Sequence, residues 1–171
     1  RETMENLYKE LRSFFANDID LTDLFDSEAI IWIDWREYDE DVVRYFSDVM
    51  AEPIDIEIVG NGKPYGDDIV LRKGDKELQI PYGDEQDRDV TIKYFNDFVK
   101  PDYEVRWFTE SLGNDTLGFT VLSGAEWANL EDEFGADTVR YYFEPINLES
   151  NMFNLDMDEV SALLELRENN R

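Results

Sequence analysis

"AIIWIDWREYDEDVV", residues 29–43, is an apolar run with two tryptophans that is followed at once by a group of acidic residues. Along an extended chain, successive side chains point to opposite faces, and residues 29–35 place apolar side chains on both. A strand of this kind is typical of the centre of a sheet that is covered on both sides. The stretch therefore predicts a central strand over residues 29–35, with Trp32 and Trp35 in the core.

The acidic residues after this strand predict the start of a helix. Asp39 is a good N-cap, and Glu40 and Asp41 fall in the first turn, where the helix dipole favours negative charge. Apolar side chains then recur at helical spacing up to Pro53. A helix start at the end of a central strand also lies on the surface, so a second interpretation stays open, in which these acids and Glu37 share in a binding face.

The rest of the chain alternates between helical and extended patterns. Helices are predicted over residues 4–16, 21–25, 90–99, 123–135 and 156–167, a β-meander over 53–83, a hairpin with strands 103–109 and 116–122, and a last strand over 138–143. Together they predict a single α+β domain over residues 1–171, with helices packed on a mixed, mostly antiparallel sheet. Met4 is the expected native start, with residues 1–3 foreign to the natural chain.

The composition is that of a folded protein with an extreme charge. Of 171 residues, 42% are apolar and 14% aromatic, which is ample for a core. The 16 Lys and Arg stand against 42 Asp and Glu, so the net charge is −26. Self-repulsion of this size opposes a compact state. A basic protein partner, mimicry of nucleic-acid phosphate, or a cytoplasm of high salt would each offset it.

The same charge argues against two classes of partner. Binding of nucleic acid requires Lys and Arg that neutralise phosphates, and here the field has the opposite sign. An anionic membrane surface is disfavoured for the same reason. No run of 18 apolar residues is present, and the N-terminal segment is charged rather than signal-like. We expect a cytoplasmic protein.

Several chemistries are absent because the chain has no cysteine and no histidine. Disulfides, thiol nucleophiles, Cys/His zinc sites and Ser-His-Asp triads are thereby excluded. Neither a G-x-S-x-G elbow nor an S-x-x-K motif is found, and with 42 acids a close carboxylate pair carries no information. We expect neither an enzyme nor a cofactor.

Two loops resemble ligand-binding motifs but depart from them. Gly60 and Gly62 begin a G-x-G pattern that Gly66 breaks, which favours a hairpin loop. Asn154, Asp156 and Asp158 begin a calcium-like loop, but Glu159 stands where such a loop needs glycine. Capping of the last helix by Asp156, with Glu159 three residues on, explains the pattern better. We expect no metal site.

Three acidic clusters form the candidate surface for a basic protein partner. An exposed tyrosine in the second cluster would serve as its anchor. The candidate partner-binding residues are Glu37, Asp39, Glu40 and Asp41 in the first cluster, Tyr65, Asp67 and Asp68 in the second, and Asp84, Glu85 and Asp87 in the third. Residues 110–115 and 126–133 are the alternative surfaces. Whether the chain forms a dimer is left open.

The latter half of the chain, "DYEVRWFTESLGNDTLGFTVLSGAEWANLEDEFG" (residues 102–135), resembles families of small acidic immunity proteins of bacterial polymorphic toxin systems, such as contact-dependent inhibition and type VI effectors. The resemblance is one of type: an α+β domain rich in tryptophan and acids, without Cys or His. It implies a protein that binds and blocks one cognate toxin. Many such toxins are basic nucleases, which would fit the sign of the charge.

Two other classes compete with this interpretation. The first is an acidic nucleic-acid mimic of the anti-restriction or anti-CRISPR type, which should present its acids as one elongated stripe. The acids here lie in separate clusters along the sequence. The second is a housekeeping protein from a halophile, which should lose structure at low salt. Circular dichroism across a salt series would test the latter.

Overall fold

The computed structural model describes residues 3–64 and 66–169. The helices are α1 (Met4–Phe15), α2 (Leu21–Phe25), α3 (Asp39–Val49), α4 (Arg88–Val99), η1 (Thr109–Ser111, a 3₁₀ turn), α5 (Gly124–Phe134), α6 (Ala136–Tyr142) and α7 (Met157–Asn169). The strands are β1 (Ile31–Asp34), β2 (Asp55–Gly60), β3 (Asp67–Lys73), β4 (Lys76–Gln79), β5 (Tyr103–Phe108), β6 (Thr116–Ser123) and β7 (Phe143–Pro145). The α+β class is confirmed, and the strands divide between two antiparallel sheets.

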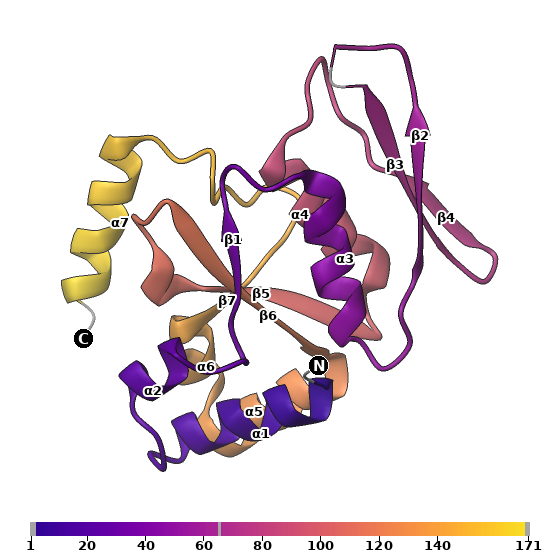
Figure 1. Ribbon diagram of the computed structural model, residues 1–171. Helices are drawn as coiled ribbons and strands as arrows, with labels where there is room; N and C mark the ends of the chain where they lie inside the picture. Colours follow the sequence, from indigo (N-terminus) through magenta and orange to yellow (C-terminus); the bar gives the residue numbers. More distant parts are fainter. Residues whose placement is uncertain (1–2, 65, 170–171) are drawn as a thin grey trace.

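The larger sheet has the strand order β1-β6-β5-β7 and carries helices on both faces. Figure 1 shows α1 and α5 side by side below this sheet, and α3 and α4 on its other side. Successive residues of β6 point to opposite layers: Phe119 packs against Phe46 of α3, with ring centroids 6.0 Å apart. Gly118 faces the other way, where a Cβ would lie 2.6 Å from Ile30. Glycine is therefore required there by close packing.

The smaller sheet, β2-β3-β4, is the predicted meander. Its central strand β3 buries Ile69 and Leu71, while β2 and β4 are largely exposed. Lys76 of β4 donates a hydrogen bond to the carbonyl of Phe98 at the end of α4, which fastens this sheet to the helical layer. In Figure 1 the three strands project to the upper right, beside α4.

Several local predictions are confirmed. The helices at residues 4–15 and 21–25 and the hairpin of β5 and β6 are present. Ser123 and Glu126 form a capping box at the start of α5, each side chain accepting the other's backbone N–H. Asp156 and Glu159 do the same ahead of α7. These signals are local, because cap and partner lie three residues apart.

The prediction that residues 29–35 form a central strand is wrong. β1 is an edge strand of four residues whose one partner among the described strands is β6. The chain turns directly after Asp34, whose carboxylate accepts the Arg36 backbone N–H at 2.9 Å. Trp32 is partly buried and stacks on Phe25 at 5.5 Å, as a structural residue should. Trp35 lies in the turn and is 60% exposed, so it is not a core residue.

Two further expectations are corrected. The N-cap of α3 is Tyr38, not Asp39; Asp39 is the first helical residue and is 6% exposed. The strand expected over residues 138–143 is a helix up to Tyr142, and only Phe143–Pro145 is extended. Gly135, with φ +95°, ends α5 and lets α6 begin at once. Packing against α5 thus outweighs the β-propensity of this segment.

Candidate functional site

The structure brings the first and third acidic clusters together through Arg88, the first residue of α4. Its Nε donates to Asp39 Oδ1 at 2.6 Å, and Nη1 donates to the Asp34 carbonyl at 2.6 Å. Nη2 donates to the carbonyls of Trp35, at 3.4 Å, and of Glu37. The guanidinium therefore fastens the turn after β1 to the start of α4, and the N-termini of α3 and α4 lie at one end of the molecule.

The second cluster joins the same end. The Gln86 side chain donates to the carbonyl of Asp67 at 3.1 Å, which places the start of β3 beside the segment that leads into α4. We call this surface the acidic end; its members are Glu37, Glu40, Asp41, Asp67, Asp68, Asp84, Glu85 and Asp87. Tyr65, the expected anchor, lies outside the described residues.

The carboxylates of the acidic end are not equivalent. Asp87 caps α4 and also accepts two hydrogen bonds from Asn154. Glu37 accepts the Tyr45 hydroxyl at 3.2 Å, and Asp41 lies 3.7 Å from Arg44. Four others form no ion pair or side-chain hydrogen bond within residues 3–64 and 66–169: Glu40, Asp67, Asp84 and Glu85. These four are the carboxylates that a partner's cations can reach most directly.

Asp39 has a different role from the one expected of it. Its carboxylate is buried, so it faces Arg88 and offers nothing to a partner. Burial raises the pKa of Asp39 above its ordinary value, against the opposing effect of Arg88. Nearby, burial also raises the pKa of the Tyr82 hydroxyl, which hydrogen-bonds to Thr91. The Tyr82–Thr91 and Arg88–Asp39 hydrogen bonds both hold the first turn of α4 in place.

Asp89 is a second structural acid that the sequence did not distinguish from its neighbours. It is fully buried and accepts the backbone N–H groups of Met152, Phe153 and Asn154 at 2.9, 2.8 and 3.0 Å. One carboxylate thus fixes the segment that leads to α7. The partners are remote in sequence, so no local pattern could have revealed them.

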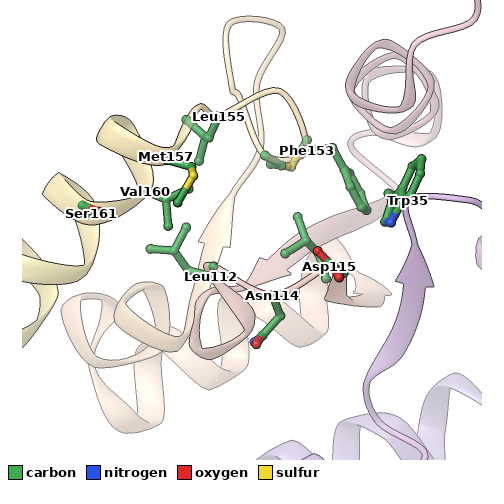
Figure 2. A pocket seen from close by; sticks show the side chains of 12 residues that line it. Trp35, Leu112, Asn114, Asp115, Phe153, Leu155, Met157, Val160 and Ser161 are labelled. Carbon is green, nitrogen blue, oxygen red and sulfur yellow. The ribbon is translucent and has the colours of Figure 1, made fainter.

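An apolar groove of about 510 Å³ adjoins the acidic end. Figure 2 shows Trp35 on one side and Met157 and Val160 of α7 on the other, with Asp115 and Leu112 between them. Further walls come from Leu117, Met152, Phe153 and Leu155. The two surfaces share Arg88, which bonds to the Trp35 carbonyl and lies 5.4 Å from the Phe153 ring.

Large apolar side chains are exposed around this groove. Trp35 is 60% exposed, Tyr38 73% and Met157 86%. None of the residues of α7 is buried, although Leu163, Leu164 and Leu166 lie in it. Exposed aromatic and methionine side chains next to acids are typical of interfaces, where aromatic residues form the energetic hot spots.

The sequence contained weak signals for this groove. Trp35 is followed directly by Arg36 and Glu37, which is unusual inside a buried strand and indicates that the strand has ended. The last helix carries leucines without a clear polar face. A helix of that kind is either buried or covered by a partner. Neither signal shows that the two segments meet.

The alternative surfaces are largely engaged within the chain. Glu131 of α5 pairs with Arg106 at 2.7 Å and Arg140 at 3.0 Å, and Glu133 pairs with Arg12 at 2.6 Å. Glu110 pairs with Arg167 at 2.6 Å. Asp115 alone among the charged residues of the 110–115 segment lines the groove. The acidic end and the groove are therefore the candidate site.

The described residues contain no group of three or more acids placed to hold a metal ion. Nor does any helix among them have the length and apolar character needed to cross a bilayer. Three polar side chains line the groove: Asn114, Asp115 and Ser161.

Comparison with known proteins gives no match to a family model, to a curated protein or to a solved structure. The geometry of the site combines an acidic surface with an adjacent apolar groove.

Trp35→Ala is expected to leave stability nearly unchanged and to weaken partner binding. Because the side chain is 60% exposed, its removal should change the free energy of unfolding by no more than about 0.5 kcal/mol. Loss of an aromatic anchor should weaken binding at least about tenfold. Urea unfolding and calorimetric titration measure the two effects. Trp32→Ala, which removes a stacked ring, is the matched control and should lower the melting temperature; an equal loss of stability for Trp35→Ala would contradict the surface assignment.

Proposed function

We propose that this protein is an immunity protein that binds and neutralises a cognate basic toxin domain in the bacterial cytoplasm. One observation carries the proposal: acidic clusters that are far apart in sequence meet at one end of a chain of charge −26, beside a groove bordered by an exposed tryptophan. The acids and the groove would together form the contact surface.

The two parts of this surface would contribute differently. Exposed carboxylates attract a basic partner over distance and raise the association rate, but each adds little to the final affinity. Desolvated aromatic and aliphatic anchors supply most of the binding energy in ordinary interfaces. A neutraliser needs both, because it has to reach its toxin quickly and release it slowly.

Reversal of charge at the acidic end tests the proposal. Single substitutions Glu40→Lys, Asp41→Lys, Asp67→Lys, Asp68→Lys, Asp84→Lys and Glu85→Lys should weaken rescue of cells that express the cognate toxin domain, which is to be sought in the neighbouring gene. Folding should be largely spared: Asp67, Asp84 and Glu85 are exposed, Glu40, Asp41 and Asp68 are half-buried, and surface carboxylates contribute little to stability. Asp132→Lys is the matched control, because Asp132 is an exposed acid on α5, on the other side of the larger sheet.

Stopped-flow association supplies the second measurement. Added salt should slow association of the wild-type pair, and substitutions at the acidic end should flatten this dependence. Full rescue by every variant, or an association rate that does not change with salt concentration, would overturn the proposal. If the protein inhibits a nucleic-acid-binding protein and not a toxin, it belongs to the class of acidic nucleic-acid mimics. Unfolding at low salt would instead indicate a halophilic origin.

A further inference from the structure

The groove combines apolar walls with one charged side chain. Leu112, Leu117 and Val160 form part of the walls, and among the described residues Asp115 is the only charged one along them. The Asp115 side chain is exposed and has no ion pair in the part of the chain that the structure describes. Its backbone carbonyl accepts the Trp35 N–H at 3.4 Å, so the carboxylate and the indole ring come from adjoining backbone.

We propose that the groove binds a segment of the partner in which a large apolar side chain is flanked by lysine or arginine. The apolar side chain enters between Trp35 and Met157, and the cation pairs with Asp115. Asp158, at the start of α7, adds negative charge beside Met157. This inference rests on the proposed function in one respect, namely that the partner is basic.

The charge of the chain selects this occupant over others. A second copy would bring another −26 to the same place and would be repelled. The same negative potential would repel anionic ligands and anionic lipid surfaces. A small-molecule site has a few polar groups that converge on its ligand. The groove is instead an open surface with mostly apolar walls, and its one charged side chain among the described residues, Asp115, is exposed.

The α7 wall is able to adjust to its occupant. None of the described residues of this helix is buried. Arg167 fastens its C-terminal part, with Nη1 2.7 Å from the Tyr141 carbonyl and the guanidinium 3.9 Å from the Tyr141 ring centroid. Beneath the helix a second cavity of about 220 Å³ contains Trp107, whose buried Nε1 has no hydrogen-bond partner among the described residues. Few buried contacts mean a low cost for local movement.

Peptide probes test the inference without the toxin. The first probe is a short synthetic peptide with leucine and tryptophan between lysines. In the second, serine replaces the two apolar residues, and in the third, glutamate replaces the lysines. At about 0.15 M salt, where charges are screened beyond about 8 Å, only the first probe should bind saturably. Amide chemical shifts should change at Leu112, Asp115, Met157 and Val160.

Groove variants separate the apolar contact from the charged one. Met157→Ser removes an exposed apolar side chain, and Asp115→Asn removes the charge alone. Each should weaken binding of the first probe roughly tenfold, and they should leave the melting temperature unchanged. Val59→Ala is the matched control, because Val59 is an exposed apolar residue of β2 outside the groove.

Three results would overturn the inference: equal binding of the serine probe, equal binding of the glutamate probe, or chemical-shift changes confined to other surfaces. Self-association that Trp35→Ala abolishes would also overturn it, because the occupant would then be a second copy. These outcomes are independent of toxin rescue. Failure of the peptide-binding inference can thus be distinguished from failure of the proposed function, which the substitutions at Asp84 and Glu85 test.

Discussion

Arg88→Ala is expected to lower the free energy of unfolding by about 3–5 kcal/mol, because it leaves the buried Asp39 carboxylate without its cationic partner. The two side chains are 10% and 7% exposed, so water reaches neither freely. The substitution also removes the donors to the carbonyls of Asp34, Trp35 and Glu37. Urea unfolding at pH 7 measures the loss.

The pH dependence of this defect should identify its cause. Burial already raises the pKa of Asp39, and without Arg88 nothing of similar size opposes that effect. A carboxyl whose pKa is higher in the folded state favours folding as the pH falls through that pKa. The gap between wild type and Arg88→Ala should therefore be smaller at pH 5 than at pH 7.

Two variants serve as controls for Arg88. Arg44→Ala removes an arginine whose ion pair with Asp41, at 3.7 Å, is exposed, and it should cost no more than about 1 kcal/mol. Asp39→Asn in the Arg88→Ala background should recover part of the stability, since it removes the buried carboxylate that has lost its partner. A pH-independent defect, or no recovery in the double variant, would show that the pair is not the cause.

Asp89→Ala should destabilise the fold by about 3–4 kcal/mol, because hydrogen bonds to a charged group contribute about 1.5–3 kcal/mol each and water recovers part of the loss. The carboxylate is the acceptor for three consecutive backbone N–H groups, those of residues 152–154. Hydrogen exchange at these three amides should accelerate more than at the core strands. Urea unfolding measures the global effect.

Asp84→Ala is the matched control, since it removes an exposed acid of the same cluster that has no hydrogen-bond partner within the described residues. It should change neither stability nor exchange. The Asp89 variant should also weaken binding of the first peptide probe, with leucine and tryptophan between lysines, because Met152 and Phe153 line the groove. Unchanged protection of residues 152–154 would show that another contact fixes this segment.

The sequence by itself determined the features whose causes are local. A cap and its partner lie three residues apart, so Ser123 with Glu126 and Asp156 with Glu159 were readable as helix starts. Alternation of apolar residues predicted the meander and the β5–β6 hairpin. The net charge of −26 is likewise a property of composition. The class of fold follows from these features together.

The tertiary structure alone decided which of these residues are buried and which meet. Trp32 and Trp35 stand three positions apart in one apolar run, yet only the turn after Asp34 makes one structural and the other exposed. Asp39 and Asp89 look like any other acid at a helix start. Asp39 is buried against Arg88, and Asp89 is buried against the backbone of residues 152–154, and both partners are remote in sequence. The pattern of apolar residues reports the face of an element, whereas burial depends on which distant segment covers that face.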